Sequence, residues 1–221
     1  MDRRSFLGKS AKIGVGLVGG SVLLSACASG DKSGKMTPLR QPGEYYVPEL
    51  PDKAIDGKEL KVGVIGCGGR GSGAVEDLLN AADGIKVTAL GDVFADRLTG
   101  LCENLKTKWN QEVPEDHCFT GFDAYKQVID SGVDMVIVAT PPVFRPAHFQ
   151  YATEKGVHSF LEKPIAVDAK GYRLIMATAK QAEAKGLSVV TGTQRHHQRP
   201  YVESFKKIQE GMIGEITGGN V

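Results

Sequence analysis

The chain has 221 residues, of which 41% are hydrophobic and 24% are charged, and its formal net charge at pH 7 is +1. This composition excludes a disordered polyelectrolyte and a collagen-like fibre, and the length suits one well-cored domain with part of a second. The near-neutral balance argues against a nucleic-acid binder, which would carry a basic stripe. The four cysteines lack the spacing of a zinc site and are too few for a disulfide scaffold, so no metal site is predicted.

The first 27 residues are typical of an export signal. Arg3 and Arg4 precede an uncharged stretch at 13–26, which is shorter than the roughly 20 residues of a membrane-spanning helix. Paired arginines followed by Phe-Leu resemble a twin-arginine signal, the route for proteins that are exported already folded. An ordinary secretory signal with two chance arginines is the alternative.

The end of this signal has two interpretations. Leu-Ser-Ala-Cys at 24–27 resembles a bacterial lipobox, in which Cys27 is lipidated and becomes the mature N-terminus, whereas Ala-Cys-Ala at 26–28 also fits a soluble cleavage site. We favour the lipobox, because residues 28–35 are small and polar, as a surface tether would be. It predicts a periplasmic or cell-surface protein that is held at the membrane by an N-terminal lipid anchor.

A nucleotide-binding βαβ unit is predicted next. A β-rich apolar run at 60–65 leads directly into Gly-Cys-Gly-Gly-Arg-Gly at 66–71. A helix is expected at 72–82, and a second strand at 85–90 ends beside Asp92. Strand, glycine loop, helix, strand and acidic residue therefore follow one another at the spacing of a dinucleotide-binding fingerprint.

Each position of this loop has a physical role in binding a dinucleotide. Gly66 permits the tight turn, Gly68 lets the backbone approach a pyrophosphate, and Gly71 lets the helix pack against the strand. Free amides at the helix start receive the phosphates. Asp92 can accept hydrogen bonds from both ribose hydroxyls and repels a 2′-phosphate, so the predicted cofactor is NAD. The predicted contacts from this unit are Gly66, Gly68, Gly69, Arg70, Gly71 and Asp92, with a solvent-facing loop arginine as the alternative for Arg70.

Helix and strand patterns continue to alternate as far as residue 191. Helices are expected at 95–109, 146–155 and 168–185, a short one opens at 122–125, and strands are expected at 134–139, 157–161 and 187–191. The alternation predicts an α/β fold with a Rossmann-like, doubly wound parallel sheet. Ligands of such sheets lie beyond the carboxyl ends of the strands, so Thr140 and Pro141 are predicted to line the cofactor. A purely structural turn is the alternative for these two residues.

Glu162, Lys163 and Pro164 follow the strand at 157–161. With the glycine loop, Gly91-Asp92, Ala-Thr-Pro-Pro at 139–142 and Gly-Thr-Gln-Arg at 192–195, they resemble the Gfo/Idh/MocA oxidoreductases over residues 59–221. The resemblance implies that Glu-Lys-Pro lies beside the nicotinamide and that the Lys-Pro bond is often cis. It also implies that Lys163 contacts substrate as the catalytic candidate and that Glu162 lies near the nicotinamide ribose.

The residues themselves give a weaker argument for Lys163. An ammonium beside the positive charge of an oxidised nicotinamide is disfavoured, which suits proton transfer with a hydroxyl. A surface pair between Lys163 and Glu162 is the alternative.

The last residues are predicted to begin a second domain, with a helix at 201–209, a turn at 211–214 and the start of a strand at 215–217. The resemblance implies a large α+β domain that supplies substrate contacts, so the chain is expected to be truncated before most of it. Arg195 and His196 are candidate substrate contacts, with surface residues of a hinge as the alternative. The expected organisation is an export signal with a lipobox at 1–27, a proline-rich linker and extended arm at 28–58, an NAD-binding domain at 59–193 and the start of a substrate domain at 194–221.

The predicted location restricts the chemistry, because a protein outside the cytoplasm has no supply of free NAD and must retain its cofactor. The sequence predicts an exported NAD-dependent oxidoreductase that transfers hydride between the bound nicotinamide and a sugar hydroxyl. An NAD-dependent glycoside hydrolase that oxidises its sugar transiently is an alternative within the enzymes. A non-catalytic nucleotide- or sugar-binding lipoprotein is the alternative from another class. The identity of the sugar and a homo-oligomeric assembly stay open.

Overall fold

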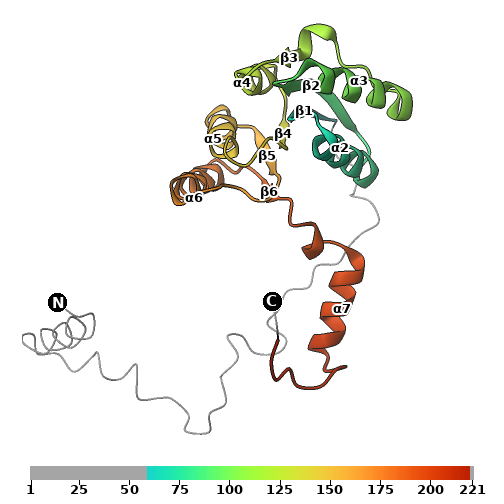
Figure 1. Cartoon of the computed structure of the whole chain (residues 1–221), viewed down its shortest axis with the longest axis vertical. Coiled ribbons are helices and arrows are strands. Elements are labelled where there is room, and N and C mark those ends of the chain that lie inside the picture. The colour runs from blue at the N-terminus through green and yellow to red at the C-terminus, as the bar shows by residue number, and fades with distance from the viewer. Residues whose placement is uncertain (1–58, 220–221) are drawn as a thin grey trace, which may run out of the picture. The chain divides into compact units, whose positions relative to one another are not determined.

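A six-stranded parallel sheet forms the centre of residues 59–219, the part of the chain that the computed structural model describes (Figure 1). The strands are β1 (Leu60–Ile65), β2 (Ile85–Asp92), β3 (Cys118–Thr120), β4 (Met135–Val138), β5 (His158–Leu161) and β6 (Val189–Thr191). They lie in the order β3-β2-β1-β4-β5-β6, and all neighbours are parallel. The chain switches direction across the sheet between β1 and β4, which is where doubly wound folds bind their ligands.

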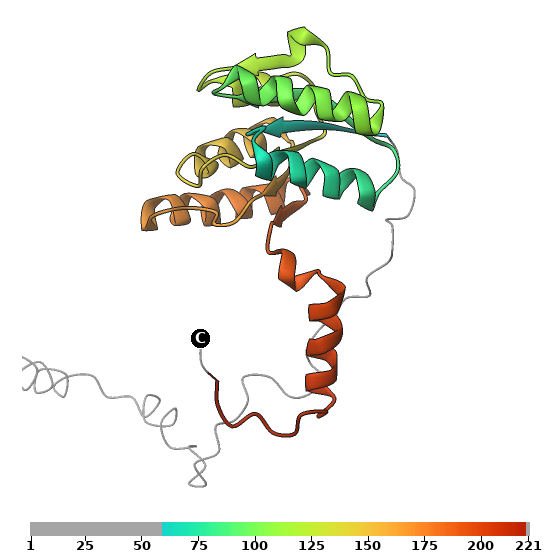
Figure 2. The same ribbon diagram turned by 45° about the vertical axis from the view of Figure 1, so that its right-hand side comes forward.

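Helices cover both faces of this sheet (Figure 2). They are α2 (Gly69–Ala81), α3 (Ala95–Trp109), α4 (Ala124–Asp130), α5 (Arg145–Lys155) and α6 (Ala169–Ala184), followed by α7 (Arg199–Gln209) after the sheet ends. The first two pack on one face of the sheet, α4 and α5 pack on the other, and α6 packs against α5. None of the helices within residues 59–219 is both long enough and apolar enough to cross a membrane.

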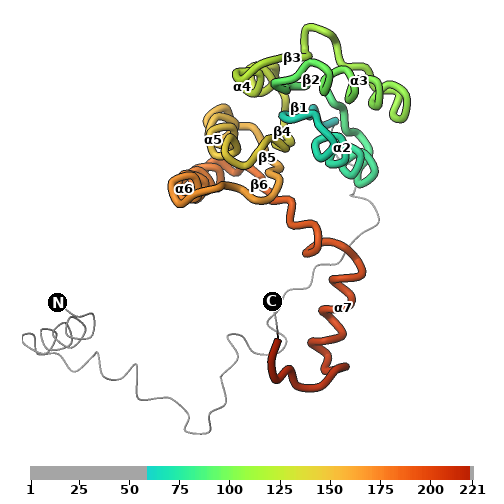
Figure 3. The backbone as a smooth tube through the Cα atoms, in the orientation of Figure 1, coloured from blue at the N-terminus to red at the C-terminus, as the bar shows by residue number. Residues whose placement is uncertain are grey.

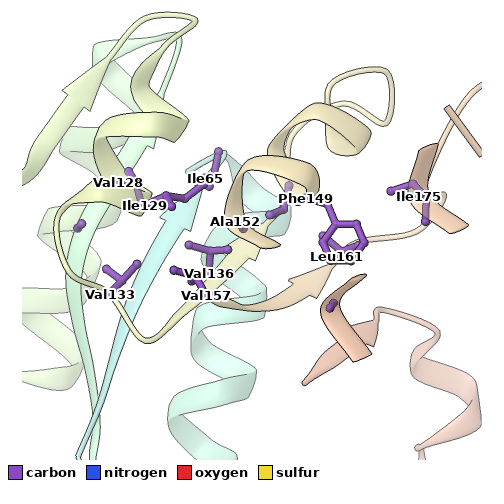
Figure 4. Packing of buried hydrophobic residues seen from close by; sticks show 13 residues of the cluster. Ile65, Val128, Ile129, Val133, Val136, Phe149, Ala152, Val157, Leu161 and Ile175 are labelled. Carbon is purple, nitrogen blue, oxygen red and sulfur yellow. The ribbon is translucent and has the colours of Figure 1, made fainter. Parts of the chain in front are cut away.

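Each face of the sheet has its own hydrophobic cluster. Val62 and Val64 of β1 belong to the cluster under α2 and α3, whereas Ile65 belongs to the cluster under α4 and α5. Figure 4 shows the second cluster, in which Phe149 of α5 is fully buried beside Leu161 of β5. Burial on both faces requires strands that are apolar throughout, which explains the near absence of polar residues in β1 and β4.

The predicted fold class is confirmed, and the backbone trace in Figure 3 follows the expected alternation of strands and helices. The helix α3 spans the predicted residues 95–109, and the Asp168 side chain caps α6 by accepting a hydrogen bond from the Gly171 amide at 2.6 Å. The helix α2 begins at Gly69 rather than at Ser72, because the last residues of the glycine loop already form its first turn.

Within residues 59–219, one expected strand is absent, and one strand was not expected. Residues 215–217 form no strand, since no described strand lies beside them to complete a ladder. Conversely, β3 was not predicted, because three residues are too few to show a periodic pattern; it exists through its pairing with Leu90–Asp92. The predicted export signal, the lipidation site at Cys27 and the linker at 28–58 lie outside the described residues.

Candidate cofactor and active site

The glycine loop after β1 packs against the turn after β4. Gly66 has a φ of +94°, a left-handed conformation that glycine adopts without strain, and a Cβ there would lie 2.8 Å from the backbone nitrogen of Thr140. A Cβ on Gly71 would collide with the carbonyl oxygen of Gly66. Backbone atoms cannot swing aside as side chains do, so the loop requires glycine at both positions.

The first turn of α2 leaves backbone amides open to a ligand. Gly68 is the N-cap and provides no side-chain cap, and the Ser72 amide donates to the Gly68 carbonyl at 2.9 Å. A Cβ on Gly68 or Gly69 would meet no atom within 4 Å. The protein's own packing therefore does not require glycine here, which leaves room for a ligand, and the positive end of the helix dipole favours an anionic one.

Asp92, the last residue of β2, is oriented by two backbone hydrogen bonds. One carboxylate oxygen accepts from the Cys67 amide at 2.7 Å, and the other accepts from the Phe94 amide at 3.0 Å. Each oxygen keeps a lone pair for a further donor. The carboxylate is thus fixed beside the glycine loop, where it can accept hydrogen bonds from a ribose as the sequence predicts.

A cleft of about 460 Å³ extends from the glycine loop along the carboxyl ends of the strands. Eight of the predicted cofactor contacts line it: Gly66, Gly68, Gly69, Arg70, Gly71, Asp92, Thr140 and Pro141. Exposed aromatic rings, which sequence reasoning missed, provide further lining: Phe94, Phe122 and Phe144. Each of these follows closely after a strand of the sheet, and this position is the signal by which they could have been found.

His148 on α5 is a further cleft residue that was not predicted. It is 7% exposed, its ring stacks on Tyr125 with centroids 4.2 Å apart, and its Nδ1 lies 3.3 Å from the Thr140 hydroxyl oxygen. Burial lowers the pKa of His148 to about 4, so the imidazole is neutral at pH 7. A neutral ring can hold the Thr140 hydroxyl in place without adding a charge beneath the cofactor.

Glu162 lies behind the glycine loop and pairs with Arg70. Glu162 is only 2% exposed, and its Oε1 accepts a hydrogen bond from the Arg70 guanidinium at 2.5 Å. A Cβ on Gly192 would lie 2.6 Å from the same oxygen, so glycine at that position makes the space that the carboxylate occupies. Arg70 therefore joins the start of α2 to the turn after β5, an ion pair that the sequence did not predict.

The turn that carries Lys163 is held from behind by Arg145. This buried arginine donates from one guanidinium nitrogen to the carbonyl oxygens of Glu162 at 2.6 Å and Pro164 at 2.5 Å. The Lys163-Pro164 peptide bond is cis, as the family resemblance implies. Lys163 itself is exposed and makes no hydrogen bond or ion pair within residues 59–219, so its ammonium is free to meet a ligand.

The two candidate substrate residues lie apart from the cleft lining. Arg195 and His196 belong to a short 3-10 helix, Gln194–His196, and the Arg195 guanidinium lies over the Tyr201 ring at 5.6 Å from its centroid. A role for them in substrate binding stays a prediction. Across residues 59–219, no group of three or more His, Cys, Asp or Glu side chains could hold a metal ion.

The geometry fits an adenine dinucleotide at the glycine-loop end of the cleft. The open amides at Gly68 and Gly69 suit the pyrophosphate, and Asp92 suits a ribose. Thr140 follows β4, which pairs with β5, the strand that precedes Lys163. Together with the strand order, these features define the class of the protein as an NAD-binding Rossmann domain.

The chain belongs to the Gfo/Idh/MocA oxidoreductase family. Residues 60–191 match the model of this family, which is described as an oxidoreductase family with an NAD-binding Rossmann fold. The match confirms the resemblance drawn from the motifs, and it confirms NAD as the cofactor of this domain.

Curated relatives align with nearly the whole chain. A glycosyl hydrolase family 109 protein of Streptomyces coelicolor is 27% identical over 222 residues, covering 100% of this chain and 44% of the relative. An alpha-N-acetylgalactosaminidase of Shewanella oneidensis is 24% identical, covering 99% of this chain and 45% of that protein. The chain thus spans less than half the length of these relatives.

Solved structures of similar proteins share the fold. A myo-inositol 2-dehydrogenase of Lactobacillus plantarum superposes with a TM-score of 0.59 and 25% identity, covering 72% of this chain and 43% of that one. A scyllo-inositol dehydrogenase of Lactobacillus casei, with bound NAD(H) and scyllo-inositol, superposes with a TM-score of 0.58 and 25% identity. This match covers 72% of this chain and 44% of that one.

Proposed function

We propose that this chain is the cofactor-binding part of an enzyme that retains NAD and uses it to cleave a glycoside. The observation that carries the proposal is the unpartnered Lys163, which follows Glu162, the ion-pair partner of the cleft residue Arg70. The choice of glycoside cleavage over other reactions is supported by relatives named glycosyl hydrolases, whose similarity spans 99–100% of this chain rather than the cofactor domain alone.

In this proposal Lys163 transfers a proton, and other residues of the chain bind the cofactor and position Lys163. Bound NAD would supply a reversible hydride acceptor: oxidation of a sugar hydroxyl to a ketone acidifies the neighbouring C–H, which permits elimination of the glycosidic substituent from the next carbon. Water would then add across the resulting double bond, and the hydride would return to the ketone. Lys163, in its neutral amine form, takes the proton of the sugar hydroxyl at Nζ and later returns it. Arg145 holds the backbone of the turn that carries Lys163, and Arg70 pairs with the neighbouring Glu162, so the point from which the Lys163 side chain extends is fixed.

The proposal is tested with full-length protein and nitrophenyl glycosides, including nitrophenyl α-N-acetylgalactosaminide, without added NAD. We expect release of nitrophenol with no accumulation of NADH, and NAD in the supernatant when the protein is denatured. Absence of nitrophenol release from every glycoside, with NAD still retained, would contradict glycoside cleavage.

Net oxidation of a sugar or polyol is the second candidate. It is supported by the likeness to a dehydrogenase whose structure holds NAD(H) and scyllo-inositol. A parallel assay with added NAD and free sugars or polyols separates the two candidates, because net oxidation requires added NAD and produces NADH, measured by absorbance at 340 nm. No turnover in either assay, with NAD still retained, would support the non-catalytic binding protein.

We also propose that the protein is exported by the twin-arginine route and tethered to the membrane through a lipid on Cys27. The support is the Arg3-Arg4 pair and the lipobox-like sequence that ends at Cys27. Replacement of Arg3 and Arg4 by lysine should leave the protein in the cytoplasm. Cys27→Ser should abolish labelling by a radioactive fatty acid, and unchanged labelling would contradict lipidation at Cys27.

A further inference from the structure

Two cysteines face each other on different elements at the β3 end of the sheet. Cys102 lies in the middle of α3, Cys118 is the first residue of β3, and their sulfur atoms are 3.6 Å apart. Both side chains are half-buried and pack against the cluster under α2 and α3. Sulfur atoms in a disulfide are about 2.05 Å apart, so bond formation needs an approach of about 1.5 Å.

The backbone around both cysteines is held in place by other contacts. The helix α3 is anchored by Leu101 and Leu105, which are 2% and 1% exposed, and β3 pairs with the end of β2 through the register of Cys118 with Leu90. The two sulfur atoms are therefore kept close by the fold, and only the side chains and small shifts of β3 are needed to close the distance.

The segment between the cysteines covers the part of β2 that β3 does not reach. The Gln111 side chain accepts from the Val87 amide at 2.9 Å and donates to the Ile85 carbonyl at 2.9 Å, and the His117 Nδ1 lies 2.9 Å from the Thr88 carbonyl oxygen. A covalent link between Cys102 and Cys118 would hold this segment against β2. It would also anchor β3, which leads directly into the cleft residues Gly121 and Phe122.

We propose that Cys102 and Cys118 form an intramolecular disulfide once the protein is in an oxidising compartment. The two thiols exchange with a small-molecule or protein disulfide: the sulfur–sulfur bond of that oxidant breaks, a new one forms between Cys102 and Cys118, and two thiols are released. Two electrons pass from the cysteines to the oxidant, and the two cysteine protons end on its thiols. The proposed export would supply such a compartment.

Cys67 provides a natural contrast within the same cluster. It is 3% exposed, and its sulfur faces the carbonyl oxygens of Val64 and Gly91 at 3.9 and 3.6 Å rather than another cysteine. Burial, together with the charge of Asp92, raises the pKa of Cys67 far above its usual value. We expect Cys67 to stay a free thiol under conditions that oxidise the pair.

The reaction is measured at equilibrium, so that the outcome does not depend on the rate of exchange. Burial and the hydrogen bond with Cys102 raise the pKa of Cys118 to about 12, and the thiolate is the species that attacks a disulfide. Full-length protein is therefore incubated to constant composition with excess oxidised glutathione, blocked with iodoacetamide, digested and analysed by mass spectrometry. We expect one peptide pair joined through Cys102 and Cys118, and carbamidomethyl groups on Cys67.

A stability measurement supports the mapping. Reduction should lower the melting temperature of the oxidised protein by about 5 °C or more, because the link closes a loop of 16 residues. Cys102→Ala and Cys118→Ala should each abolish that shift, while Cys67→Ala should leave it unchanged.

Free thiols at both positions after equilibration, or a link of either one to Cys67, would overturn the proposal. The mapping uses the unmodified chain, so it does not depend on whether a variant folds. A negative result would not contradict the proposal of glycoside cleavage, since neither cysteine lines the cofactor cleft.

Discussion

The two sides of the cofactor cleft are held by different kinds of contact. The dinucleotide side is local: Gly66 to Asp92 form one βαβ unit, and Asp92 is oriented by the amides of Cys67 and Phe94 within that unit and its next turn. The reaction side is not local. The turn at Glu162–Pro164 is held by Arg70, Arg145 and the space at Gly192, which come from three other parts of the chain.

This difference predicts which substitutions should change cofactor affinity and which should change turnover. Substitutions on the dinucleotide side should change cofactor affinity, because the groups there are placed to bind the pyrophosphate and a ribose rather than the reacting atoms of NAD. Substitutions on the reaction side should change turnover while leaving the cofactor bound. Activity and affinity measured on the same variants therefore separate the two sides.

The largest effect is expected for Lys163→Ala, which removes the proton carrier of the reaction side. Turnover should fall by about 10² to 10⁴, the usual contribution of a general acid or base. The amount of NAD that copurifies should stay the same, as measured by mass analysis after denaturation. Lys170→Ala on the exposed start of α6 is the matched control, and turnover at the wild-type rate in Lys163→Ala would remove Lys163 from the mechanism.

The sequence predicts the local side of the cleft far better than the other. The loop at 66–71, Asp92, Thr140 and Pro141 could all be placed, because strand ends and glycine positions determine them within a few residues. The register of the sheet then brings them together.

The reaction side shows why the rest could not be predicted. The family resemblance points to Glu162 and Lys163, but nothing in the pattern says that Arg70, 92 residues away, pairs with Glu162. Arg145 and His148 are polar residues of a helix without a clear apolar face in its sequence, and only packing shows that they are buried against the turn and the cleft. Contacts of long sequence separation leave no periodic signal.

His148 lines the cleft, and its burial predicts a pH dependence of stability. The pKa of histidine is about 6.5 in an unfolded chain and about 4 here, so the unfolded state binds more protons between these values. Stability is complete above about pH 6.5 and is lost as the pH falls toward 4, by about 3 kcal/mol. Melting curves of the wild type and His148→Gln should converge in acid, with exposed His196→Gln behaving as the wild type. If His148→Gln lost as much stability in acid as the wild type does, the pH dependence could not come from His148.

Gly192→Ala tests whether the reaction side depends on the Glu162–Arg70 pair. The new methyl group would lie 2.6 Å from the Glu162 carboxylate and must displace it. Turnover should fall about tenfold, equivalent to about 1.4 kcal/mol of barrier, with NAD still bound. Gly100→Ala on α3 is the control, since a Cβ there meets no atom within 4 Å. Unchanged turnover would show that the pair does not position Lys163.

An effect of similar size, and the sharpest contrast with Lys163, is expected for Asp92→Ala. Loss of the ribose acceptor should weaken NAD binding about tenfold, within the range for a hydrogen bond to a charged group. Loss of the negative charge should bring the affinity for NADP closer to that for NAD. Calorimetry with both cofactors measures the preference, and Asp96→Ala at the exposed start of α3 is the control. At saturating NAD, turnover should recover, because Asp92 contacts no reacting atom. A turnover defect that persists at saturation would mean that the two sides are not separable, and that the Asp92 bond to the Cys67 amide shapes the whole loop.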